Sequence, residues 1–393
     1  MRLAERTTKV GASPTLKVLL AAAQLTREGA DIVDLGAGEP DFSTPAHVKA
    51  AAQQAITENF TRYTPNAGIP ELKQAIAGRY REQYGVEYAE HEIIVTAGGK
   101  QALFNIAMAL FGQGDEVVIH APCWPTLVEV VKLADATPTI VRTHADEGFS
   151  VTADTILAGI TPRTKGIIIN SPGNPTGALM SERDMAAIAD AVTGRDIWVV
   201  IDLCYERLIY DPTPHDLVGV LSRRLRDRAV FAGSASKTYA MTGWRCGWVL
   251  APPDVVAACN AIQSHSTSNV SSISQRAALA ALTGPQDCVA EMLAEYRARR
   301  DQVHAWLTED GRITCVKPAG AFYLFPNLTA MLSPDGIRTT AELAEALLHQ
   351  AHVAVTAGEA FDSPGFARIS YATSLDRLRE GVDRILGFAD RKT

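Results

Sequence analysis

One lysine in the chain is surrounded by residues suited to covalent chemistry. Lys237 lies in the segment FAGSASKTYAMTGWRCGWVL at 231–250, after small and hydroxylated residues and before an apolar, aromatic run. Partial burial disfavours the ammonium form and lowers the pKa of a lysine, and the neutral amine can then form a Schiff base with an aldehyde. The alternative is a lysine that only extends from the core at a helix end, and this segment alone does not decide between them.

The same segment carries groups that could hold a phosphate. Ser234 and Ser236 precede the lysine and Arg245 follows it. Two hydroxyls and one guanidinium form a set suited to a phosphate dianion.

A second phosphate-binding feature is expected near residue 98. In TAGGKQAL, an apparent strand runs through Gly98 and Gly99 into a helix that begins near Lys100. Free backbone N–H groups and the helix dipole at such a helix start attract anions. The segment is not a Walker loop, because the first glycine of that motif is missing and glutamine follows the lysine. A simple turn is the alternative.

Other expected strands end in polar or aromatic side chains. Asp202 ends the strand of VVIDLCY, where a buried carboxylate needs a cationic partner such as a protonated pyridine nitrogen, and Tyr205 could reach the same site. Trp124 in APCWPT could stack on a heteroaromatic ring, and Asn174 in INSPGNPTG could bond a phenolic oxygen or a carboxylate. Singly, each has a plain structural alternative. Their succession at strand ends predicts a site for an aldehyde cofactor with a phosphate and a pyridine ring.

The elements that must position these residues follow a βα rhythm. Between about Glu92 and Pro252, short β-branched runs alternate with longer amphipathic stretches, which indicates a mainly parallel sheet. Ligands bind at the carboxyl ends of such strands. From Pro285 a long helical pattern and then mixed elements predict a smaller α+β domain. At 393 residues, the chain is long enough for two domains.

Composition argues against several classes of protein. A formal net charge of -7 is unlike that of a nucleic-acid binder, and no apolar stretch suggests a membrane span or a signal peptide, so we expect a cytoplasmic protein. The six cysteines contain no C-x-x-C pair, and the nine histidines show no metal-ligand spacing. We therefore expect neither a disulfide framework nor a metal site.

The segments resemble those of class I pyridoxal-phosphate aminotransferases of fold type I, in the subgroup that includes many bacterial aspartate aminotransferases. The resemblance covers nearly the whole chain and rests on LGAGEPDFSTP, RYTPNAGIPEL, TAGGKQALFN, NSPGNPTG, SASKTYAMTGWRCGW, PAGAFYLF and ARISYATS. It implies an α/β fold, with a mainly parallel seven-stranded sheet flanked by helices and a smaller α+β domain. The implied division is 1–45 joining the small domain, 46–295 as the large cofactor-binding domain and 296–393 as the small domain.

The resemblance also implies roles for individual residues. Lys237 would carry pyridoxal 5′-phosphate and move the proton, Asp202 would keep the ring nitrogen protonated, and Tyr205 would bond the phenolic oxygen. The implied cofactor-binding residues are Tyr63, Gly98, Gly99, Lys100, Trp124, Asn174, Asp202, Tyr205, Ser234, Ser236, Lys237 and Arg245.

The implied substrate site centres on Arg368 in ARISYA. This arginine would clamp the α-carboxylate with help from Asn174 and the Gly38 backbone, beside Trp124, and Lys100 would contact the distal carboxylate of the substrate. Tyr63 resembles a tyrosine that reaches the cofactor phosphate of a neighbouring subunit, which implies a homodimer with shared sites.

The implied reaction is a ping-pong transfer of an amino group between an L-amino acid, with aspartate and glutamate favoured, and a 2-oxo acid. Lys100 facing solvent is the alternative to its substrate role. The chain departs from the family pattern at Cys123 and Leu127, near the expected substrate side chain, so an aromatic or prephenate-type specificity is the second interpretation. A pyridoxal-phosphate lyase and a non-catalytic regulator are further alternatives, but no segment reads as a helix-turn-helix.

Overall fold

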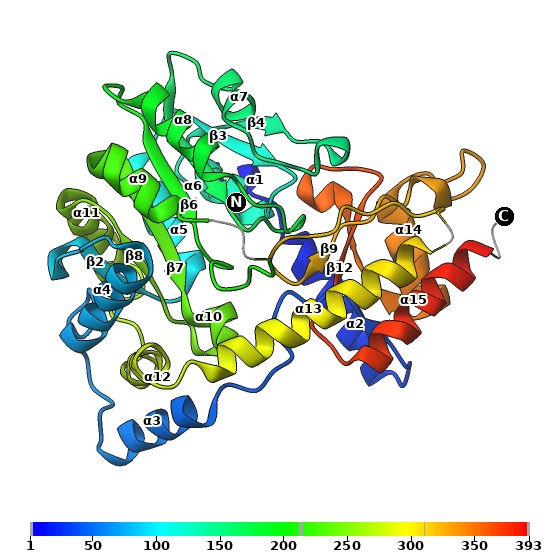
Figure 1. The fold of residues 1–393 in the computed structure, drawn as a ribbon, viewed down its shortest axis with the longest axis horizontal. Helices are drawn as coiled ribbons and strands as arrows, with labels where there is room; N and C mark the ends of the chain where they lie inside the picture. Colours follow the sequence, from blue (N-terminus) through cyan, green and yellow to red (C-terminus); the bar gives the residue numbers. More distant parts are fainter. Residues whose placement is uncertain (1–2, 212–214, 310, 391–393) are drawn as a thin grey trace.

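A seven-stranded sheet forms the centre of the larger part of the molecule (Figure 1). The computed structural model describes residues 3–211, 215–309 and 311–390. β8 runs antiparallel to both of its neighbours, and the other strands run parallel. The expected fold class is confirmed. The strand order is β2 (Ile93–Thr96), β8 (Gly247–Leu250), β7 (Ala229–Ser234), β6 (Trp198–Asp202), β5 (Thr164–Asn170), β3 (Glu116–Ala121) and β4 (Thr137–Arg142).

Helices cover both faces of this sheet, because its central strands are apolar on both sides. Every residue of β6 and β7 is buried. Side chains alternate between the faces, so that Val200 and Val230 join one core cluster and Ile201 and Phe231 join the other. The first cluster includes α5 (Gly99–Leu110), α6 (Pro125–Leu133) and α11 (Pro253–Ser264); the second includes α4 (Pro70–Tyr84), α8 (Glu182–Val192), α9 (Leu217–Leu225) and α12 (Ser272–Thr283).

A separate hydrophobic core lies beside the large sheet. It includes residues of a two-stranded sheet, β1 (Val33–Asp34) with β10 (Val353–Ala354), and of a three-stranded sheet, β11 (Thr356–Ala357), β12 (Ala367–Ser370) and β9 (Tyr323–Leu324). It also includes α14 (Thr340–Ala346) and α15 (Leu375–Asp390). The parallel pairing of β1 with β10 joins an early segment of the chain to a late one.

One long helix connects the two regions. α13 (Asp287–Thr308) crosses the front of the molecule in Figure 1. Val289 at its start packs in one core of the large sheet, whereas Met292 and Leu307 pack in the separate core. The helix therefore contributes to both hydrophobic cores.

The remaining elements are short or peripheral. α2 begins after Ser13, whose hydroxyl accepts the N–H of Leu16, and Ala22 packs against Leu348 and Ala354. Among the residues described, none of the helices combines the length and the apolar character needed to cross a bilayer. The bounds are α1 (Arg6–Lys9), α2 (Pro14–Arg27), α3 (Ala46–Thr57), α7 (Ala153–Ala158), α10 (Ala235–Thr238), the 3-10 turns η1 (Glu90–Glu92), η2 (Ala145–Glu147), η3 (Arg226–Arg228), η4 (Thr242–Trp244), η5 (Thr329–Met331) and η7 (Gly358–Phe361), and the π turn η6 (Leu347–Ala351).

Candidate active site

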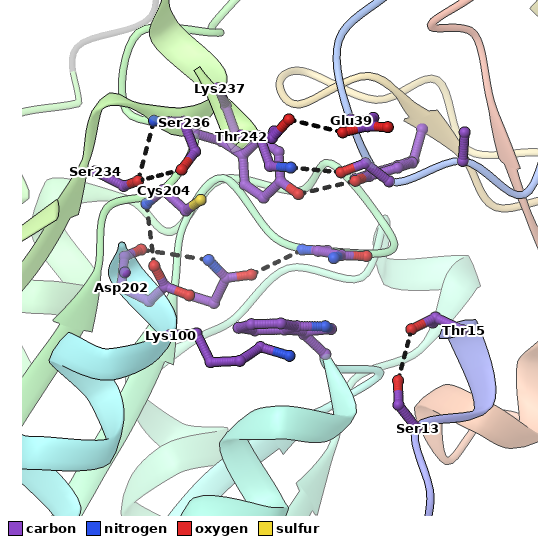
Figure 2. A pocket seen from close by; sticks show the side chains of 18 of the residues that line it. Ser13, Thr15, Glu39, Lys100, Asp202, Cys204, Ser234, Ser236, Lys237 and Thr242 are labelled. Atoms are coloured by element: carbon purple, nitrogen blue, oxygen red, sulfur yellow. Dashed lines mark hydrogen bonds between the residues drawn. The ribbon is translucent and has the colours of Figure 1, made fainter. Parts of the chain in front are cut away.

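A cavity of about 380 Å³ opens at the carboxyl ends of β5, β6 and β7, between the large sheet and the separate core. In the view of Figure 2, Lys237 and Thr242 lie on one side and Lys100 on the other. The structure thus brings together most of the residues predicted from the sequence. Those that line the cavity are Gly38, Gly99, Lys100, Trp124, Asn174, Asp202, Tyr205, Ser234, Ser236, Lys237, Arg245 and Arg368.

Lys237 is held on the short helix α10, directly after β7. The side chain of Ser234 caps this helix by accepting the N–H of Ser236 at 3.0 Å. Nζ of Lys237 donates to the carbonyl of Gly38. Burial lowers the pKa of this amine, although Cys204 and then Glu39 act in the opposite direction. The structure therefore gives Lys237 the lowered basicity that a nucleophilic amine needs.

Asp202 is a buried carboxylate at the end of β6. Its side chain accepts the N–H of Cys204 at 3.0 Å. Burial raises its pKa to about 7, and the Cys204 hydrogen bond only partly offsets this. In the part of the chain that the structure describes, no lysine or arginine forms an ion pair with it. Because a lone buried carboxylate is costly, the site is suited to a ligand that brings a positive charge.

Hydroxyl, guanidinium and backbone donors gather beside α10. The Ser234 and Ser236 hydroxyls lie 2.8 Å apart, and Arg245 donates to the carbonyls of Thr242 and Ala97 at 2.8 and 3.2 Å. α5 begins at Gly99, so its free N–H groups face the same region. This donor set can hold a phosphate.

Gly98 does not line the cavity, but the arrangement depends on it. Its φ is +82°, and a Cβ at this position would lie 2.6 Å from Nη2 of Arg245. The absence of a side chain therefore allows the guanidinium to approach the start of α5.

Arg368 is buried on β12 with only 2% of its surface exposed. Nη1 donates to Oδ1 of Asn174 at 3.1 Å, and Nη2 donates to the carbonyl of Gly36 at 2.8 Å. The guanidinium lies 4.4 Å from the ring centroid of Tyr323 and 5.3 Å from that of Phe361. Among the residues that the structure describes, Nε has no hydrogen-bond partner. A rigid, buried guanidinium at a cavity wall is suited to binding a carboxylate.

Lys100 and Trp124 form another wall of the cavity. Nζ of Lys100 lies 4.8 Å from the Trp124 ring centroid. Partial burial lowers the pKa of this lysine, and the charge of Arg245 lowers it further. Cys123 and Leu127, where the chain departs from the family pattern, are buried in the core and do not line the cavity.

Tyr205 and Tyr63, the remaining predicted residues, lie in different surroundings. The hydroxyl of Tyr205 lies 2.9 Å from that of Tyr323, and both side chains are buried. Tyr63 is 90% exposed and lies away from the cavity of its own chain.

Comparison with known proteins gives the family. The family described as "Aminotransferase class I and II" matches residues 30–385. The chain belongs to this family. The aminotransferase is 40% identical over 392 residues, all of both chains, to an aspartate aminotransferase from Geobacillus stearothermophilus. It is 41% identical to an aspartate/prephenate aminotransferase from Cereibacter sphaeroides, over 98% of each chain.

A solved structure gives the same result for the fold. The aminotransferase superposes on the aspartate aminotransferase from Thermus thermophilus with maleate at a TM-score of 0.93, with 38% identity, covering 99% of this chain and 100% of that one. The resemblance stated from the sequence, fold type I and the aminotransferase activity are confirmed.

Several cavity residues of the aminotransferase were not identified from the sequence. Asn170 ends the predicted strand GIIIN and Tyr323 lies in the quoted motif GAFYLF, so these two carried a signal. Glu39, which accepts the hydroxyl of Thr242 at 2.6 Å, belongs to LGAGEPDFSTP. Gly36, Ala37, Leu103, Cys204 and Thr242 also line the cavity and lie in quoted segments, whereas the N-terminal residues Ser13, Thr15, Leu16 and Leu19 had no chemical signal.

Proposed function

We propose that this aminotransferase binds pyridoxal 5′-phosphate and moves an amino group between L-aspartate or L-glutamate and a 2-oxo acid by a ping-pong mechanism. The observation that carries the proposal is the one cavity that holds Lys237, the unpaired carboxylate of Asp202 and the buried guanidinium of Arg368. Each group needs a partner of a particular chemistry. Together they fit a cofactor and an amino acid side by side.

The residues present fit this cofactor. Lys237 offers an amine of lowered basicity, and Asp202 offers a carboxylate with which no lysine or arginine of the described residues forms an ion pair. The hydroxyls of Ser234 and Ser236, the Arg245 guanidinium and the start of α5 at Gly99 all line the same cavity, and together they offer the donors that a phosphate needs. When bound, pyridoxal phosphate supplies an aldehyde that captures amines and a ring that withdraws electrons from the substrate Cα.

Each side chain would then have a defined part. Nζ of Lys237 would bind the aldehyde carbon, and the carboxylate of Asp202 would hold the proton on the ring nitrogen. The Tyr205 hydroxyl and the Asn174 amide would bond the phenolic oxygen, and the Trp124 ring would cover one face of the pyridine. The phosphate would be held by Ser234, Ser236, Arg245 and the N–H groups at the start of α5.

Lys237 is also the general base of the reaction. Its Nζ lies in the cavity and, as a neutral amine, would accept the proton from the substrate Cα. A lowered pKa leaves a larger fraction of this amine neutral at physiological pH. The same atom would then donate this proton to the aldehyde-derived carbon of the cofactor, so one residue would serve as base and then as acid.

The substrate would be held at its two ends. Arg368 would bind the α-carboxylate, beside Asn174 and the Gly38 backbone. Lys100 would bind the distal carboxylate, because its ammonium lies on the cavity wall over Trp124. The names of relatives as aspartate aminotransferases support this specificity.

A second specificity is favoured by one relative. The protein from Cereibacter sphaeroides is named an aspartate/prephenate aminotransferase, so prephenate is the second candidate acceptor. Because Cys123 and Leu127 are buried in the core and do not line the cavity, these two departures from the family pattern do not favour an aromatic substrate.

We further propose a cytoplasmic homodimer with shared sites. Tyr63 lies 90% exposed on its own chain, as expected of a side chain that reaches the phosphate in a partner.

Steady-state kinetics test the proposed specificity. With 2-oxoglutarate as acceptor, the kcat/KM for aspartate should exceed that for phenylalanine, tyrosine and alanine. A higher value for an aromatic donor would contradict the assignment of Lys100. A parallel series with aspartate as donor would rank prephenate against 2-oxoglutarate.

A further inference from the structure

A buried histidine outside the cavity contacts the site through the backbone. His120 is the penultimate residue of β3 and is 3% exposed. It does not line the cavity. Its Nε2 accepts the backbone N–H of Asn170 at 3.2 Å, and Asn170 does line the cavity.

The imidazole takes the place of a strand carbonyl at this point. The regular pairing of β3 with β5 ends at Ile119 and Ile168, so the N–H of Asn170 is bonded by a side chain instead. A backbone N–H can only donate, and therefore Nε2 is unprotonated and the ring proton lies on Nδ1. Burial lowers the pKa of His120 to about 4, which keeps this acceptor available at physiological pH.

Hydrogen bonds link Asn170 to the residues proposed to bind the substrate. Its Oδ1 accepts the backbone N–H of Asn174 at 2.8 Å, and its Nδ2 donates to the carbonyl of Asp202 at 3.3 Å. Oδ1 of Asn174 in turn accepts from Arg368 at 3.1 Å. These side chains are all buried, so a continuous hydrogen-bonded chain runs from His120 to the guanidinium.

We propose that His120 is a positioning residue for the substrate carboxylate. It fixes the backbone of Asn170, which fixes Asn174, which sets the position of the Arg368 guanidinium. The inference rests on the proposed function, because it takes Arg368 as the group that binds the α-carboxylate. A displaced guanidinium would lose the paired N–H geometry that matches a carboxylate, and this would weaken substrate binding.

Two substitutions separate the hydrogen bond from simple packing. In His120→Gln, the side-chain oxygen can accept the N–H of Asn170 from nearly the place of Nε2. In His120→Met, a side chain of similar length fills the space but provides no strong acceptor. His120→Met should leave the N–H of Asn170 without an acceptor, whereas His120→Gln should keep this hydrogen bond.

The expected readout is binding rather than turnover. Calorimetry on the holoenzyme would measure the dissociation constant of maleate, a dicarboxylate without an amino group. His120→Met should raise the dissociation constant of maleate about tenfold. The KM for both aspartate and alanine should rise by a similar factor, whereas kcat should change by less than about threefold. Because the α-carboxylate is common to all substrates, the loss should not depend on the side chain. His120→Gln should recover most of the binding.

Other results would overturn the inference. If His120→Met lowers only the melting temperature and leaves the maleate affinity and both KM values unchanged, His120 serves stability alone. If His120→Gln binds maleate as weakly as His120→Met does, then the packing of the imidazole ring matters and the hydrogen bond accepted by its Nε2 does not. A wild-type holoenzyme that neither binds maleate nor transaminates would instead reject the proposed function, together with this inference.

Discussion

The guanidinium of Arg368 and the amide of Asn174 meet at 3.1 Å in a buried contact. Arg368 lies on β12, which packs in the separate core, and Asn174 follows β5 of the large sheet. The site therefore depends on how the two regions pack together, and it brings a substrate-binding cation next to the predicted cofactor position.

Replacing Arg368 by lysine should damage substrate binding more than folding. Lysine keeps the positive charge but loses the paired N–H groups that match a carboxylate. We expect kcat/KM for aspartate to fall on the order of 100-fold, the range expected when a buried charge pair loses its geometry. Steady-state kinetics with a thermal melt as control would measure both effects. If the kcat/KM of the variant for aspartate stays within threefold of the wild-type value, Arg368 does not bind the α-carboxylate.

Replacing Lys100 by alanine tests the specificity. The KM for aspartate and glutamate should rise about tenfold, because a partly hydrated ion pair of roughly 1–2 kcal/mol is lost, whereas the KM for alanine and phenylalanine should change little. Lys132→Ala, a lysine on α6 outside the cavity, is the matched control. An equal rise in KM for all four amino acids would show that Lys100 does not contact the substrate side chain.

The buried carboxyl of Asp202 should make the cofactor-free protein less stable as the pH rises. The folded state holds this proton up to a pKa of about 7, whereas the unfolded chain releases it near pH 4. Between these values the folded state binds more protons, so the free energy of unfolding falls with pH. The loss from this group between pH 5 and pH 8 should be on the order of 2–3 kcal/mol.

Asp202→Asn provides the comparison for that measurement. Urea unfolding of the cofactor-free protein at pH 5 and pH 8 should show a smaller difference in the variant than in the wild type. If the two proteins lose the same stability, this carboxyl does not titrate in the range. Asp202→Asn should also weaken cofactor binding, because the amide cannot balance a protonated ring nitrogen.

The shared-site arrangement predicts complementation between inactive subunits. When Tyr63→Ala and Lys237→Ala chains are mixed, unfolded and refolded, half of the dimers should contain one subunit of each kind. In those dimers one site carries both defects and the other carries neither, so activity should recover to about a quarter of wild type. Activity no higher than the mean of the two parents would reject the role of Tyr63.

The sequence was sufficient for the fold and for most of the cavity. β-branched runs that end in Gly, Ser, Asp or Asn identify parallel strands, and their carboxyl ends must meet at one edge of the sheet. This argument correctly gathered residues such as Asp202, Asn174 and Ser234 without any knowledge of their contacts.

The rest depends on where side chains point once a strand has ended. Trp124 precedes α6 and faces the cavity, whereas Leu127, three residues later, turns into the core with Val130 and Val131. No sequence pattern distinguishes these directions. Leu16 lines the cavity only because the N-terminal segment packs across it. The domain limits at 45/46 and 295/296 and the role of Tyr63 stay predictions.

The most direct test of the account is chemical trapping at Lys237. Borohydride reduction of the protein loaded with pyridoxal phosphate, followed by digestion and mass spectrometry, should place one pyridoxyl group on the peptide that contains this lysine. Lys237→Ala should carry no label and should not turn over aspartate. A label on another lysine, no label at all, or full turnover by Lys237→Ala would contradict the central claim.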